Sequence, residues 1–196
     1  MQIIERSKQL FDYEITIDNG FKEWLGEHPT KGDILYIFGT AILATGLLII
    51  CYYGELRQLP VWRSILYIIV AFDIIGGAVA NFSLSTDRYY AQNGKKRWIF
   101  FAEHIVHFLL LYVAVGGNYW FWISIFAYTM GSGVIVNLIR KNRIQELAAA
   151  ALVTTGCIAF YGFNLLIPLT GWFPAVFMIK IIIGFAVQRT RQPQVN

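Results

Sequence analysis

Residues 34–53 read ILYIFGTAILATGLLIICYY and contain no charged side chain. A helix rises about 1.5 Å per residue, so twenty residues span about 30 Å, the thickness of the hydrocarbon core of a bilayer. The stretch is therefore predicted to be a transmembrane helix. Every later inference about the fold depends on finding more stretches of this kind.

Five further apolar stretches follow along the chain. They cover residues 64–82, 98–115, 119–139, 147–167 and 171–187. Each run is continuous, whereas transmembrane strands alternate apolar and polar residues over about ten positions. The sequence is 57% hydrophobic and only 14% charged, against about 25% charged residues in ordinary soluble domains. We therefore predict an all-α, polytopic membrane protein with a six-helix transmembrane bundle over residues 34–188.

The positions of lysine and arginine predict the orientation. Cytoplasmic loops of membrane proteins are enriched in both residues. With six spans and both termini in the cytoplasm, thirteen basic residues fall on the inner side and two on the outer side. The prediction is thus a multi-pass protein of the plasma membrane with cytoplasmic N- and C-termini, the latter in a short tail over residues 189–196. No stretch outside the spans interleaves aromatic and basic residues, so the expected partner is the lipid bilayer and not a nucleic acid.

The first 33 residues differ from the rest because they are polar. Among their charges lies an apolar group of Phe21, Trp24 and Leu25. This amphipathic pattern predicts one or two short helices on the cytoplasmic membrane surface, and the alternative is a small cap packed under the bundle. Asp33, directly before the first span, is expected to be its N-cap.

Ionisable residues inside the spans are the main functional signal. Such residues are costly in a bilayer and usually mark a functional site. Counted along the helices at 1.5 Å per residue, Asp73 of the second span and His107 of the third share a depth of about 13 Å from the inner ends. We therefore expect one shared site of candidate catalytic residues: Asp73, Glu103, His104, His107 and Lys180.

A groove of small residues lies on the same side of the second span as Asp73. Gly77 belongs to this groove, and such surfaces allow close helix approach or leave room for a ligand. Asn81 follows near the inner end of that span, and Asn137 lies near the inner end of the fourth. We predict that Gly77, Asn81 and Asn137 bind substrate at the mouth of the site.

Four functions are compatible with this set. His104, His107 and Glu103 could bind a divalent metal such as zinc or iron. The same groups could perform acid–base catalysis without a metal. They could carry protons in a small proton-coupled transporter or channel, or they could simply neutralise one another in a structural subunit. The leading hypothesis is an enzyme acting on a lipid or isoprenoid-like substrate, with His107 as base or ligand, Asp73 as its partner and Lys180 as counter-charge.

Overall fold

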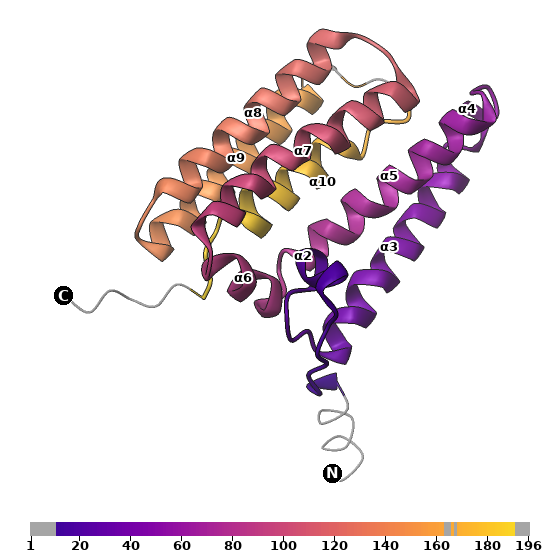
Figure 1. Cartoon of the computed structure of the whole chain (residues 1–196). Helices are drawn as coiled ribbons and strands as arrows, with labels where there is room; N and C mark the ends of the chain where they lie inside the picture. The colour runs from indigo at the N-terminus through magenta and orange to yellow at the C-terminus, as the bar shows by residue number, and fades with distance from the viewer. Residues whose placement is uncertain (1–10, 163–165, 167, 191–196) are drawn as a thin grey trace, which may run out of the picture.

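A computed structural model describes residues 11–162, 166 and 168–190 and shows a bundle of helices (Figure 1). Within these residues, five helices are long and apolar enough to cross a membrane. They are α3 (Lys31–Cys51), α5 (Val61–Ala80), α7 (Gly94–Val115), α8 (Tyr119–Leu138) and α9 (Asn142–Gly162). The helical, membrane-compatible bundle predicted from the sequence is thus confirmed.

Short helices join the long ones at the two ends of the bundle (Figure 1). Helix α4 (Tyr53–Leu56) connects α3 to α5 at one end, called here the α4 end. Helix α6 (Leu84–Ala91) connects α5 to α7 at the opposite end, the α6 end. The 3₁₀ turn η1 (Asn19–Phe21) and helix α2 (Lys22–Leu25) also lie at the α6 end, where α2 packs on α6.

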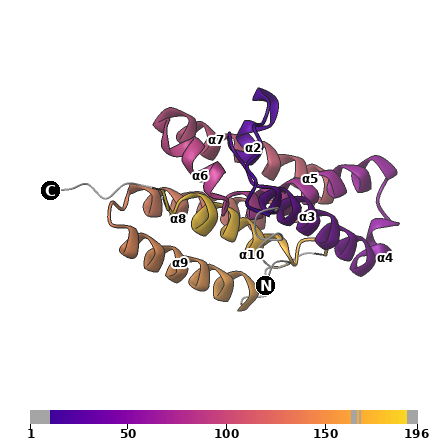
Figure 2. The same ribbon diagram turned by 90° about the horizontal axis from the view of Figure 1, so that it is seen from below.

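The sixth apolar stretch forms a shorter and more central element than expected. It consists of helix α10 (Phe173–Met178) and the π-helical segment η2 (Ile179–Phe185), which follow one another directly. At about 1.5 Å per residue these span roughly 20 Å, less than the hydrocarbon core. The element contacts α5, α8 and α9, and Figure 2 shows it in the middle of the bundle. Its Phe173, Phe177 and Ile181 side chains have no exposed surface.

The described part of the N-terminal segment is a cap on the bundle. Residues 13–17 lie antiparallel to residues 27–31, and the Ile15 amide donates to the Pro29 carbonyl at 2.9 Å. The cap is tied to α6, where the His28 amide donates to Ser85 Oγ at 3.0 Å. Residues 11–30 therefore follow the cap alternative, while the part of the predicted surface helix in residues 1–10 lies outside the described residues.

The start of α3 differs by three residues from the expectation. Thr30 is the N-cap, and its hydroxyl accepts a hydrogen bond from the Asp33 amide at 3.0 Å. The Asp33 carboxylate accepts in return from the Thr30 amide at 2.9 Å. This reciprocal arrangement is a capping box, so Asp33 occupies the third helical position and not the N-cap. The prediction that Asp33 is the N-cap was wrong. An aspartate before an apolar run can be either the N-cap or the third helical residue, and here it is the latter because Thr30 is the N-cap.

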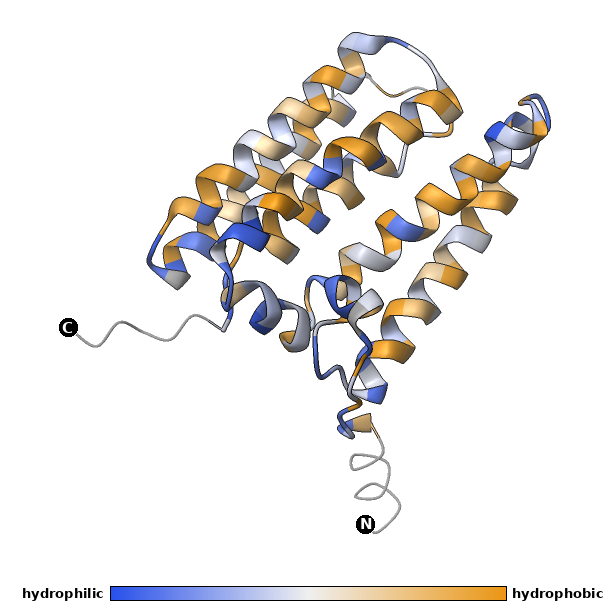
Figure 3. Cartoon of the chain, in the orientation of Figure 1, coloured by the Kyte–Doolittle hydropathy of each residue, from blue (hydrophilic) through white to orange (hydrophobic). Residues whose placement is uncertain are grey.

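Large aromatic side chains fill the half of the bundle toward the α4 end. Phe108 and Trp122 are in edge contact with ring centroids 5.7 Å apart, and the Trp122 and Phe173 centroids are 5.5 Å apart. Phe173 stacks on Phe177 at 4.9 Å. Figure 3 shows the long helices as mostly apolar, with isolated hydrophilic bands in α5 and α7. The polar interior of the protein is thus displaced toward the α6 end.

Candidate functional site

A cavity of about 160 Å³ lies at the α6 half of the bundle, between α5, α7 and η2. All five candidate catalytic residues and two of the three candidate substrate-binding residues line it: Asp73, Gly77, Asn81, Glu103, His104, His107 and Lys180. Five residues that were not predicted as site residues complete its wall: Glu23, Trp24, Ala80, Tyr90 and Phe100. The ionisable residues that were expected at similar depths on separate helices thus line one cavity.

The carboxylate of Asp73 is the centre of the charged contacts. His107 Nε2 lies 2.8 Å from Asp73 Oδ2, and Lys180 Nζ lies 3.8 Å from the same oxygen. A carboxylate only accepts hydrogen bonds, so Nε2 of His107 carries a proton directed at Asp73. The other ring nitrogen, Nδ1, is buried and has no hydrogen-bond partner. In the neutral ring that nitrogen has a free lone pair, as a general base requires.

His104 presents a second free acceptor to the cavity. Its ring is only 3% exposed, and its Nδ1 lies 2.7 Å from the Phe100 carbonyl oxygen. A carbonyl cannot donate, so this contact places the proton of the neutral ring on Nδ1. Nε2 is then an acceptor, and it is buried without a hydrogen-bond partner. The His104 and His107 rings lie 5.2 Å apart, so both free nitrogens belong to one small volume.

Gly77 and Asn81 position Lys180. A Cβ atom added at Gly77 would lie 2.5 Å from Lys180 Nζ, so only glycine leaves room for the ammonium group here. Asn81 Nδ2 donates to the Lys180 backbone carbonyl at 3.0 Å. This carbonyl lies in the π-helical segment η2; such segments interrupt the regular hydrogen-bond ladder and occur often at functional sites. Both residues therefore shape the cavity through Lys180.

The mouth of the cavity is acidic and borders an apolar surface. Glu23 and Glu103 line the cavity and are both exposed. On the same face of α7 as Glu103, Ile99, Val106 and Leu110 are 43%, 52% and 38% exposed. Exposed aliphatic side chains on a membrane-compatible helix face lipid. The opening of the cavity thus lies where a lipid-facing helix surface meets the N-terminal cap.

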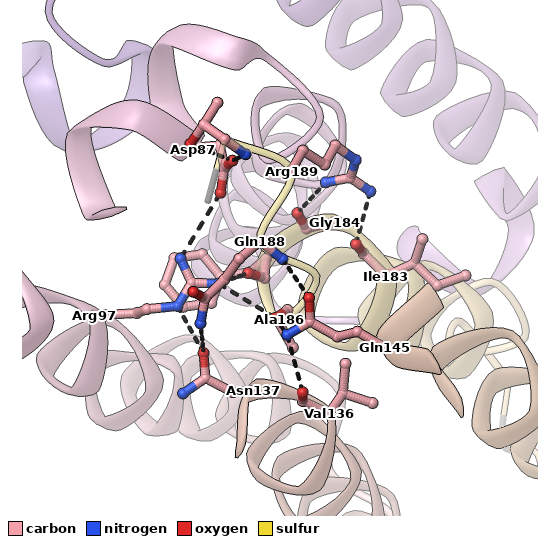
Figure 4. A network of polar contacts seen from close by, with 12 residues as sticks. Asp87, Arg97, Val136, Asn137, Gln145, Ile183, Gly184, Ala186, Gln188 and Arg189 are labelled. Carbon is pink, nitrogen blue, oxygen red and sulfur yellow. Dashed lines mark hydrogen bonds and ion pairs between the residues drawn. The ribbon is translucent and has the colours of Figure 1, made fainter. Parts of the chain in front are cut away.

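Asn137 lies outside the cavity, in a second polar cluster at the end of η2 (Figure 4). Its Oδ1 accepts from Arg97 Nε at 2.7 Å and from Gln188 Nε2 at 3.0 Å. Arg97 is 5% exposed, and its Nη2 also donates to the carbonyls of Phe185 and Ala186. The cluster therefore caps the C-terminus of the central helix. Asn137 was expected beside the other site residues, but its side chain contacts Arg97 and Gln188 instead. Depth along a helix does not specify which way a helix face points.

Other members of this cluster complete the cap. Gln145 Nε2 donates to the Ala186 carbonyl at 3.1 Å, and Arg189 donates to the carbonyls of Gly184 and Ile183 at 2.8 and 2.9 Å. Asp87 lies 3.8 Å from Arg97 Nη1 and accepts from the Thr190 amide at 2.6 Å. Carbonyls at a helix end need partners when the end is buried, and cations there also oppose the helix dipole. Arg97 and Arg189, counted as orientation signals in the sequence, thus serve as caps.

The cavity does not have the geometry of a metal centre. Across the described residues, no three histidine, cysteine, aspartate or glutamate side chains are placed to hold one metal ion. The predicted set of His104, His107 and Glu103 is therefore not carried into the function proposed below.

The N-terminal residues that line the cavity, Glu23 and Trp24, were not predicted as site residues because they are distant in sequence from its other members. The Tyr90 hydroxyl donates to the Glu23 carbonyl at 3.0 Å and so fixes α2 over the cavity. Burial raises the pKa of Tyr90, which keeps this hydroxyl protonated as a donor. The only hint in the sequence is the apolar group around Trp24 within a polar segment.

Comparison with known proteins gives no relative. No protein-family model matches the chain, and no curated protein or solved structure is significantly similar to it. The function must therefore be argued from the site itself.

Proposed function

We propose that the protein is a membrane-embedded enzyme that acts on a lipid-like substrate by metal-free acid–base chemistry. In this proposal the chain crosses the plasma membrane with its termini in the cytoplasm, and the substrate head reaches the cavity sideways from the inner leaflet. The observation that carries the proposal is the pairing of Asp73 with His107 beside a cavity, with the second ring nitrogen of His107 buried and free.

His107 Nδ1 is the proposed general base. It takes a proton from the substrate, and the resulting imidazolium is stabilised by Asp73, 2.8 Å from the opposite nitrogen. Asp73 also fixes which nitrogen carries the proton, as an orienting carboxylate does in catalytic dyads. Lys180, 3.8 Å from Asp73, balances the buried negative charge before the reaction. A positioned base of this kind contributes about 10²–10⁴-fold to a rate.

Two observations favour an enzyme over the alternatives. A structural ion pair of Asp73 and Lys180 would not need a cavity of about 160 Å³ beside it. A transporter needs access from both sides in turn, whereas the half of the bundle toward the α4 end is packed with Trp122, Phe173 and Phe177, each at most 1% exposed. A one-sided site is what an enzyme requires.

The test uses full-length protein in vesicles made from a total membrane lipid extract. Lipids are followed by mass spectrometry with the wild type, His107→Ala, Asp73→Asn and, as a control outside the cavity, His28→Ala. We expect the wild type and His28→Ala to convert at least one lipid, and the two cavity variants to be at least a hundredfold slower. An unchanged lipid profile with the wild type contradicts the proposal. A pH-sensitive dye inside the vesicles tests the rival function, and a proton flux that depends on Asp73 without lipid turnover would establish a transporter instead.

A further inference from the structure

His104 is a binding group that the acid–base mechanism leaves unused. The proposed base is His107 and its partner is Asp73, yet His104 is the more deeply buried histidine, at 3% exposure. Its Nδ1 proton is directed at the Phe100 carbonyl, so Nε2 has a lone pair and no partner. A buried acceptor without a hydrogen bond destabilises the folded protein. A ligand that donates a hydrogen bond to Nε2 would remove this cost.

The charges around the cavity select the kind of donor. Deep inside, Asp73 and Lys180 face each other at 3.8 Å, so their charges offset one another. The two remaining acids of the lining, Glu23 and Glu103, are exposed at the mouth, where they repel anions. An anionic headgroup such as a phosphate therefore meets like charge before it reaches Lys180. An added cation inside finds no net negative charge to pair with, because Lys180 already offsets Asp73. An uncharged donor meets neither obstacle.

The size and surroundings of the cavity select the rest of the ligand. A volume of about 160 Å³ resembles that of an apolar cavity that holds one benzene molecule, so it takes a headgroup and not a whole lipid. The remainder of the ligand must lie outside, where Ile99, Val106 and Leu110 form an apolar surface on the Glu103 side of α7. That surface suits a hydrocarbon chain.

We propose that the cavity binds an uncharged lipid alcohol, with its hydroxyl group donating a hydrogen bond to His104 Nε2 and its hydrocarbon chain lying along α7. This assigns a substrate class to the site and rests on the proposed function for its chemical role. Because the hydroxyl hydrogen is directed at His104, the proton that His107 removes must come from another group of the substrate, which the 5.2 Å separation of the two ring centroids places close by. His104 would thus be a specificity-determining residue, distinct from the base.

The test compares ligands that share one chain and differ only in the head. The probes are 1-dodecanol, dodecyl methyl ether, dodecyl phosphate and dodecylamine, each titrated into full-length protein in lipid nanodiscs. Nitrogen-15 NMR of histidine-labelled protein reports on the unprotonated His104 nitrogen directly. The chain has three histidines, so a His28→Gln variant leaves only the two cavity rings to be assigned.

We expect 1-dodecanol to bind and to shift the Nε2 resonance of His104, as acceptance of a hydrogen bond requires. The ether lacks the donor, so it should bind about tenfold more weakly and leave that resonance in place. The phosphate and the amine should also bind more weakly than the alcohol. Equal affinity for alcohol and ether, tighter binding of either charged probe, or an unmoved resonance with the alcohol would overturn the proposal.

A His104→Phe variant provides an independent check. Phe100 and Phe177 already flank this ring, with centroids 4.3 and 6.3 Å away, so the site accommodates an aromatic replacement. In this variant the alcohol and the ether should bind equally, whereas a persisting preference for the alcohol contradicts the assignment. The wild-type ligand series gives a result even if the variant does not fold. Binding without lipid turnover would remove only the enzyme function, and turnover without alcohol preference would remove only the role of His104.

Discussion

The protein contains two buried polar regions at the same end of the bundle, and they are built in opposite ways. In the cluster around Arg97, donors and acceptors meet: Asn137, Asp87 and the last carbonyls of η2 all have partners (Figure 4). In the cavity around Asp73, a ring nitrogen of each histidine has none, and about 160 Å³ lies beside them. The proposed functional site therefore differs from the Arg97 cluster by incomplete hydrogen bonding next to a cavity, and not by the burial of charge.

The largest expected effect comes from breaking the satisfied region. Arg97→Met keeps much of the side-chain volume but leaves Asp87 and the carbonyls of Phe185 and Ala186 without this donor. Removing one partner from a buried charged pair costs about 3–5 kcal/mol. We expect a loss of this order in the free energy of unfolding, measured by denaturation in detergent micelles. The exposed Lys95→Met is the matched control and should stay within about 0.5 kcal/mol of wild type.

The second prediction contrasts the charged pairs of the two regions. In Asp73→Asn/Lys180→Met, both charges of the cavity are removed while a side-chain carbonyl oxygen remains to accept from His107. Stability should be unchanged or rise by about 1–4 kcal/mol while lipid turnover is lost. The corresponding Asp87→Leu/Arg97→Met variant should be destabilised, because the helix carbonyls remain unsatisfied. The same denaturation experiment measures both. Equal responses of the two double variants would mean that the regions do not differ in kind.

A smaller effect is expected where a backbone position shapes the cavity. Gly77→Ala places a methyl group 2.5 Å from the present position of Lys180 Nζ and so displaces the ammonium from Asp73. We expect the lipid turnover proposed above to fall about tenfold, with overpacking costing about 1–3 kcal/mol of stability. Gly131→Ala is the control, since nothing lies within 4 Å of a Cβ there. Wild-type turnover in Gly77→Ala would show that the position of Lys180 is unimportant.

The smallest expected effect on the free energy of unfolding comes from an ordinary helix cap, with which the cluster around Arg97 can be compared. Thr30→Ala removes the hydroxyl half of a single capping box, at the start of α3. The loss should be about 1 kcal/mol in the free energy of unfolding. If Arg97→Met cost no more than Thr30→Ala, the buried cluster would be no stronger than an ordinary helix cap.

Sequence reasoning located the helices well because charge-free runs report directly on a hydrocarbon environment. It did not predict that the sixth run forms a short, central helix, since apolar side chains look the same whether protein or lipid surrounds them. Phe173 and Ile181 are in fact surrounded by protein. Counting along helices gave the depth of Asp73 and His107. It gave no facing direction for Asn137 and no means of placing Trp24 over the cavity, because both depend on contacts between distant segments.

The short central helix also bears on how the chain enters the membrane. Alone in lipid, α10 and η2 would be too short to cross, and Lys180 at the centre of a helix opposes insertion by about 2.5–3.5 kcal/mol. Its Asp73 partner and its carbonyl caps exist only once α5, α7 and α9 are assembled around it. We therefore expect this segment to be the last to settle during biogenesis, so that chains truncated before residue 173 should insert normally yet leave an open groove in the bundle.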